Sequence, residues 1–183
     1  GDVPLVSEKS LQELIDKSEN GFSILTTRLD DPFGYGRVIT DADNFATAIV
    51  EEKDATTDEK SIREIFTGVL CGQKELIDEG LAELNNNNAA GEFYLTDLVS
   101  IISNKGFKIK TYSAPNNEVK GANSKAELAQ LEGIYREMKS EELLDKGVTV
   151  ADPARLDIRG EVDAGKDCLI DFKVILEGNV TMG

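Results

Sequence analysis

Apolar residues in the first 145 positions alternate between short continuous runs and helical spacings. Leucine and isoleucine recur three and four residues apart after Pro4, after residue 73, after Thr96 and after Ser124, which predicts helices there. The apolar runs, rich in β-branched residues, predict strands over 22–29, 37–40, 45–51, 65–71 and 107–113. Helices and strands mixed in this way indicate an α/β domain.

Polar residues mark the ends of several predicted elements. Thr96 is placed to cap a helix that Gly106 ends, and Ser124 and Glu127 have the spacing of a capping box. The glycine- and proline-containing segment 30–36 predicts a loop, and the acidic segment 52–64 predicts a solvated loop with a short helix. These signals set the boundaries of the α/β pattern.

The last part of the chain follows a period of six residues. Such a period fits neither a lone helix nor an ordinary sheet, whereas a hexapeptide-repeat parallel β-helix has it. One coil cannot cover its own open face, because repeats bury apolar surface against neighbouring coils. An irregular β tail is the alternative. One series is Ile158, Ala164, Ile170, Leu176 and Met182, and the second, four residues later each time, is Val162, Cys168, Val174 and Val180.

The composition of the chain restricts which partners and which kinds of site it can have. The formal net charge of −15 argues against nucleic-acid and anionic-membrane partners. The sequence shows neither a membrane-spanning window nor a signal peptide, so we expect a cytoplasmic protein with Cys71 and Cys168 reduced. Histidine is absent, which excludes histidine-dependent triads and zinc sites within this chain. Oxygen-ligand chemistry remains, and it suits a hard cation such as Mg²⁺.

Six short stretches, taken in order, resemble the bacterial bifunctional UDP-N-acetylglucosamine pyrophosphorylase / glucosamine-1-phosphate N-acetyltransferase. Each stretch alone is a weak signal, but the ordered set spans essentially the whole chain and is highly specific. The stretches are GDVPL (1–5), YGRV (35–38), IVEEKDA (49–55), GEFYLTD (91–97), GANSKAELAQLE (121–132) and DPARLDIRGEV (152–162).

The resemblance implies three parts. Residues 1–123 would be the C-terminal part of a nucleotide-diphospho-sugar transferase (Rossmann-like) domain, and 124–147 a linker helix. Residues 148–183 would be the first coils of a left-handed parallel β-helix, which in this family packs as a homotrimer. The family's phosphate-binding loop and acetyltransferase site would lie outside the chain, so we expect the chain alone to be inactive.

The resemblance also implies a site. Asp2 would be one ligand of Mg²⁺ and Asn123 the other, with Gly1 beside them at the substrate. Without the resemblance, Asp2 would be interpreted as a solvated acid and Asn123 as a helix cap. In the family's reaction, a phosphate oxygen of N-acetylglucosamine-1-phosphate attacks the α-phosphorus of UTP, and pyrophosphate leaves. UDP-N-acetylglucosamine is the product, and the second activity uses acetyl-CoA.

Four further residues are implied to bind the sugar. Gly36 would let the backbone approach it, and Glu51 would accept hydrogen bonds from its hydroxyls. Tyr94 and Thr96 would line the pocket. The simpler interpretations are an exposed charge at a strand end for Glu51 and a plain N-cap for Thr96.

One residue departs from the family pattern. The family has asparagine in E-I-N-T-G, where it contacts the N-acetylsugar, but this chain has Phe66. A phenyl ring cannot make that hydrogen bond. A related nucleotidyltransferase that uses another sugar phosphate therefore stays open. A further alternative, from a different class, is a non-catalytic module whose β-helix only drives trimerisation.

Overall fold

The computed structural model describes residues 3–18, 21–122 and 124–183. It consists of two compact units, Gly1–Lys120 and Gly121–Gly183. In the described parts of the chain, no helix has the length and apolar character needed to cross a membrane. The mixture of helices and strands confirms the predicted α/β class.

A five-stranded sheet, in the order β3-β2-β4-β1-β5, forms the centre of the first unit. β1 runs antiparallel to β4 and parallel to β5, and β2 runs antiparallel to both β3 and β4. All five predicted strands are present. The last begins later than predicted, because Ile109 makes an isolated bridge to Ala46 instead of joining β5. The bounds are Phe22–Arg28 (β1), Arg37–Thr40 (β2), Ala46–Val50 (β3), Glu64–Gly72 (β4) and Lys110–Ser113 (β5).

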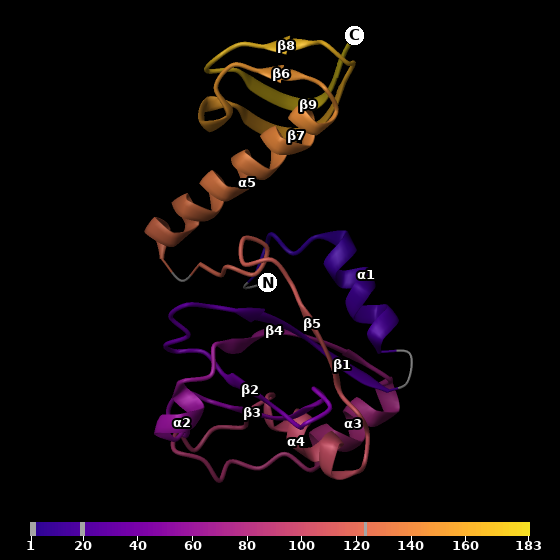
Figure 1. Ribbon diagram of the computed structural model, residues 1–183, viewed down its shortest axis with the longest axis vertical. Helices are drawn as coiled ribbons and strands as arrows, with labels where there is room; N and C mark the ends of the chain where they lie inside the picture. The colour runs from indigo at the N-terminus through magenta and orange to yellow at the C-terminus, as the bar shows by residue number, and fades with distance from the viewer. Residues whose placement is uncertain (1–2, 19–20, 123) are drawn as a thin grey trace. The chain divides into compact units, whose positions relative to one another are not determined.

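Helices cover both faces of this sheet (Figure 1). On one face, Leu14 of α1 packs with Leu25 of β1. On the other, α3 and α4 pack against Phe22 and Ile24 of the same strand. β1 serves both faces because successive side chains of a strand point in opposite directions. The helices are Glu8–Lys17 (α1), Thr57–Lys60 (α2), Lys74–Ala82 (α3) and Asp97–Asn104 (α4).

The packing of α4 decides where its first residues lie. Leu98, Val99 and Ile102 of α4 are buried in one cluster with Ala46 and Ile49 of β3. The start of the helix is therefore held near the end of β3. This arrangement brings together segments that are far apart in the sequence.

The second unit begins with a long helix and continues as short parallel strands. Ser124 caps α5 as predicted, accepting a hydrogen bond from the Glu127 backbone N–H at 3.2 Å. Two parallel pairs follow, β6 with β8 and β7 with β9. The elements are Lys125–Asp145 (α5), Thr149–Val150 (β6), the 3₁₀ helix Pro153–Arg155, Asp157–Ala164 (β7), Leu169–Ile170 (β8) and Ile175–Met182 (β9).

The six-residue period corresponds to this parallel stacking. Ile158 pairs with Leu176 and Val162 with Val180, so residues three repeats apart in the sequence lie side by side. Together with Leu143 of α5, most of both repeat series belongs to the core of the second unit. Gly160 allows the strands to come close, since a Cβ there would lie 2.3 Å from the carbonyl oxygen of Gly178.

Candidate functional site

Three chain segments of the first unit meet at the end of β3. Glu51 directly follows β3, Gly36 directly precedes β2, and Thr96 directly precedes α4, with Tyr94 two residues before it. We call these four residues the Glu51 cluster. They are the predicted sugar-binding residues, and the structure brings them together.

A side-chain hydrogen bond joins two members of the cluster. The Thr96 hydroxyl donates to Oε1 of Glu51 at 2.9 Å. Thr96 is buried, and in the described part of the chain its side chain makes no capping hydrogen bond to α4. Its backbone is helical, at φ −62° and ψ −25°, whereas a capping residue normally has extended geometry. The hydroxyl therefore orients the Glu51 carboxylate. Thr96 does stand at the predicted N-cap position of α4, but within the described residues its side chain does not cap the helix.

Gly36 has no side chain, and its backbone lies next to the Glu51 carboxylate. A Cβ at this position would lie 2.7 Å from Cγ2 of Ile49 and 3.4 Å from Oε1 of Glu51, so no larger residue fits unless its neighbours move. The carbonyl oxygen of Gly36 accepts a hydrogen bond from the backbone N–H of Phe66 at 3.0 Å. The hydrogen bond from Phe66 thus ties Gly36 to β4, and Ile49 of β3 lies in close contact with it.

Carboxylates surround Tyr94. Desolvation raises the pKa of its phenol above the usual value, and the negative charges of Asp54, Glu92, Glu51 and Asp97 raise it further. Desolvation also raises the pKa of Asp97, with a contribution from Asp54. The phenol of Tyr94 therefore remains a neutral hydrogen-bond donor and acceptor at neutral pH.

Phe66 lies beside the cluster and takes part in the core. Phe66 is 8% exposed and belongs to the buried cluster that includes Val38 and Ile49. The side chain contributes apolar surface, and only its backbone N–H reaches Gly36. The structure thus gives Phe66 a packing role at the position where the predicted resemblance has a polar side chain.

Arg37 and Glu52 were missed by the sequence analysis. Arg37 is almost fully buried, with its side chain 2% exposed, and its Nη2 lies 2.6 Å from Oε2 of Glu52. Each residue directly follows a member of the Glu51 cluster. A signal was present in the sequence, because an arginine that opens an apolar strand is rarely buried unless it is paired.

The other three predicted site residues are Gly1, Asp2 and Asn123, and they lie outside the described residues. Within the ranges that the structure describes, no group of three or more carboxylate or cysteine side chains is arranged to hold a metal ion. Asp2 and Asn123 therefore remain predicted ligands of Mg²⁺.

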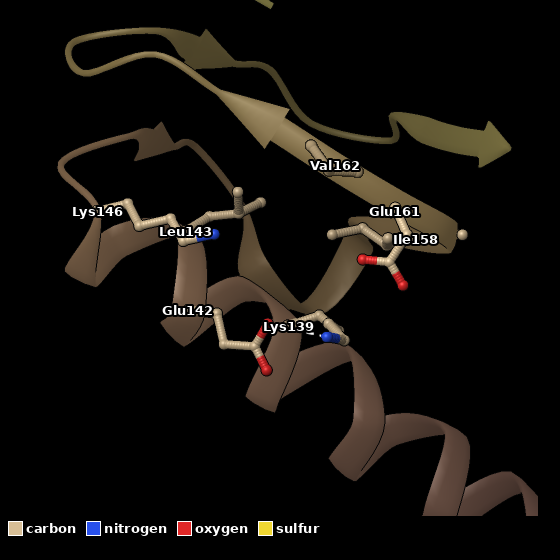
Figure 2. Close-up of a pocket in the computed structure, with 8 residues that line it drawn as sticks. Lys139, Glu142, Leu143, Lys146, Ile158, Glu161 and Val162 are labelled. Carbon is tan, nitrogen blue, oxygen red and sulfur yellow. Dashed lines mark hydrogen bonds and ion pairs between the residues drawn. The ribbon is translucent and has the colours of Figure 1, made fainter. Parts of the chain in front are cut away.

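The second unit has a shallow hollow between α5 and β7 (Figure 2). Lys139 forms an ion pair with Glu142 at 2.8 Å on one side, and Glu161 lies on the other. Its acidic and basic side chains thus occur together, and Leu143 and Ile158 also line the hollow. None of the predicted site residues that the structure describes lines it.

Comparison with known proteins places the whole chain within longer relatives. No family model matches the chain. "Bifunctional protein GlmU" from Burkholderia multivorans is 47% identical over 184 residues, and that from Paraburkholderia phymatum is 44% identical over 185 residues. Both matches cover 100% of this chain and 41% of the relative. The predicted resemblance is therefore confirmed: along its full length, this chain is similar to part of the bifunctional GlmU proteins.

Proposed function

We propose that the chain carries the sugar-binding side of a Mg²⁺-dependent uridyltransferase that makes UDP-N-acetylglucosamine from UTP and N-acetylglucosamine-1-phosphate. The observation that carries this proposal is the Thr96–Glu51 hydrogen bond of 2.9 Å beside the bare backbone of Gly36. The whole-chain similarity to bifunctional relatives supports it. In the same protein, a second activity would acetylate glucosamine-1-phosphate with acetyl-CoA.

The Glu51 carboxylate suits a sugar because it is an acceptor that is already oriented. An ionised carboxylate has several acceptor sites. Thr96 uses one of those on Oε1 of Glu51, and others can accept from sugar hydroxyls. The absence of a side chain at Gly36 lets the ring approach the backbone. Tyr94 adds an amphipathic wall, which is common in small-molecule sites.

Asp2 and Asn123 are the proposed ligands of Mg²⁺. Their carboxylate and amide oxygens are donors that this cation accepts, usually together with phosphate oxygens and waters. The bound ion would neutralise charge on the reacting phosphates. The residues on this side of the site would bind the sugar phosphate and orient it for in-line attack.

The second unit is proposed to be the start of a left-handed β-helix that trimerises in the longer protein. Parallel stacking at a spacing of three hexapeptides and the shared core of both repeat series support this proposal. The chain spans 41% of the length of the curated relatives it matches, so we propose that it catalyses neither reaction alone. Pyrophosphate release from UTP by the 183-residue chain would contradict this.

Sugar binding can be tested on the chain by nuclear magnetic resonance titration, which detects weak affinity. UDP-N-acetylglucosamine should shift the backbone amides of Gly36, Glu51 and Thr96. Glu51→Gln should weaken binding by about tenfold or more, because a hydrogen bond to a charged group is lost. Glu142→Gln in the second unit is the matched control. Shifts confined to other residues would contradict the proposed site.

A second candidate is a nucleotidyltransferase for another sugar phosphate. The apolar packing of Phe66 favours it, since the ring offers no hydrogen bond to an N-acetyl group. The same titration with UDP-glucose discriminates the two functions. Tighter binding of UDP-glucose would favour the second candidate, and tighter binding of the N-acetylated ligand the first.

A further inference from the structure

We infer that Arg37 and Glu52 act as a positioning pair, which sets the spacing of Gly36 and Glu51 and thereby the affinity for the sugar. This inference rests on the proposed function. Neither residue is assigned a contact with the ligand. Both act through the neighbour that precedes them in the chain.

The contacts of the pair tie two segments together. Nη2 of Arg37 donates to Oε2 of Glu52 at 2.6 Å, and Nη1 donates to the carbonyl oxygen of Tyr35. Oε2 of Glu52 also accepts from the backbone N–H of Gly34 at 3.4 Å. The loop that ends in Gly36 is therefore fastened to the segment that begins with Glu51.

Burial makes the guanidinium dependent on these partners. The Arg37 side chain is 2% exposed and that of Glu52 is 19% exposed. Among the described residues, Nε of Arg37 is buried without a hydrogen-bond partner. A buried charge that loses its partner is strongly unfavourable, so removing Glu52 forces the arginine or its loop to move.

Such a movement would reach the Glu51 cluster directly. Gly36 and Arg37 share a peptide bond, and the carbonyl of Gly36 is held by the Phe66 N–H. A displacement of about 1 Å in an active site can lower the reaction rate about a hundredfold, which shows how closely a site depends on the spacing of its groups. Lysine cannot replace Arg37, because one ammonium does not reproduce two fixed donors that point at separate acceptors.

The test is a titration of the 183-residue chain with UDP-N-acetylglucosamine. Arg37→Gln, Arg37→Lys and Glu52→Gln should each weaken binding by about tenfold or more, because each disrupts the pair that holds Gly36 at its distance from Glu51. The double variant Arg37→Gln/Glu52→Gln should bind no worse than either single variant, because the two groups act as one unit. Lys105→Gln, which breaks an ion pair with Glu83 of 2.9 Å, is the control and should bind like the wild type.

Amide hydrogen exchange provides a readout that needs no ligand. In the Arg37 and Glu52 variants, exchange at Phe66 should accelerate as its acceptor Gly36 moves, while the ladder between β1 and β5 stays protected. A merely stabilising pair would accelerate exchange across the whole sheet and leave the affinity of the folded protein unchanged.

Three results would overturn the inference. One is wild-type affinity in folded Glu52→Gln or Arg37→Lys, and the second is additive losses in the double variant. Unchanged exchange at Phe66 is the third. If the wild type itself fails to bind while Phe66 exchange responds, the proposed function is wrong, and the role of the pair in sugar binding is wrong with it.

Discussion

Thr96 donates its hydroxyl to Oε1 of Glu51 at 2.9 Å and leaves the helix that it precedes without a side-chain cap among the described residues. The distance in sequence between the two residues shows that this bond depends on tertiary packing. It exists because Val99 and Ile102 hold α4 against β3. A residue type that usually stabilises a helix end is used here to orient a carboxylate.

Thr96→Val should weaken the binding of UDP-N-acetylglucosamine by about tenfold, because Glu51 loses the donor that orients it. Thr96→Ser keeps the hydroxyl and is the matched control. Titration calorimetry or magnetic resonance can measure both variants. Equal affinities for Thr96→Val and wild type would show that the hydrogen bond does not serve the site.

Gly36→Ala should lower both stability and sugar affinity. Its Cβ would lie 2.7 Å from Cγ2 of Ile49, and overpacking of this kind costs about 1–3 kcal/mol. Gly133→Ala is the control, since Gly133 lies in α5 with nothing within 4 Å of an added Cβ. That change should stabilise the second unit by about 0.5–1 kcal/mol through helix propensity. Urea denaturation measures both; an unchanged midpoint for Gly36→Ala would contradict the close contact.

Glu52 should make the first unit sensitive to acid. The hydrogen bond from Arg37 is the main cause that lowers the pKa of this carboxyl below its ordinary value of 4.5. A carboxyl whose pKa is lower in the folded state stabilises the fold above its unfolded pKa, and this contribution is lost as the pH falls through the folded value.

The wild type should therefore lose thermal stability below about pH 4.5 more steeply than Glu52→Gln, whose side chain does not titrate. Melting temperatures recorded from neutral pH down to pH 3 would show the difference. Asp43→Asn, an exposed change in the turn between β2 and β3, controls for general effects of net charge. Parallel curves for wild type and Glu52→Gln would contradict the prediction.

Gly160→Ala should destabilise the second unit alone. The added Cβ would lie 2.3 Å from the backbone oxygen of Gly178, and Gly160 has a φ of +149° that other residues rarely adopt. Gly165→Ala meets only ordinary contacts of 3.5 Å and more and serves as the control. Hydrogen exchange should show faster opening of β7 and β9 with the first unit unchanged. Equal protection in both variants would contradict the close stacking.

The sequence predicted the elements well where periodicity is strong. The strand over Phe22–Arg28 and the capped helix after Ser124 follow from local pattern and from a single capping residue. The six-residue period also predicted which residues of the second unit point into a common core. Local signals suffice for such features because the side-chain direction repeats with the backbone geometry.

The contacts within the candidate site were harder to predict from the sequence than the helices and strands. Thr96 fits a helix cap and a pocket wall equally well in the sequence, and only the packing of α4 on β3 brings its hydroxyl to Glu51. From the sequence alone, Arg37 was assigned no role, and only the fold brings Glu52 to its guanidinium. The sequence can signal that a buried Arg37 needs a partner, but which residue becomes that partner depends on a loop conformation that no residue pattern specifies.

The position of β1 between β4 and β5 has a kinetic consequence. β2, β3 and β4 pair among neighbours in the chain, but β1 pairs Ser23 with Cys71 on one side and with Lys110 on the other. Closing such long loops is slow relative to forming a hairpin, so the β2–β3 hairpin is available early and the parallel edge is completed last. During synthesis, the edge of β1 that pairs with β5 therefore stays open until the chain as far as Ser113 has left the ribosome.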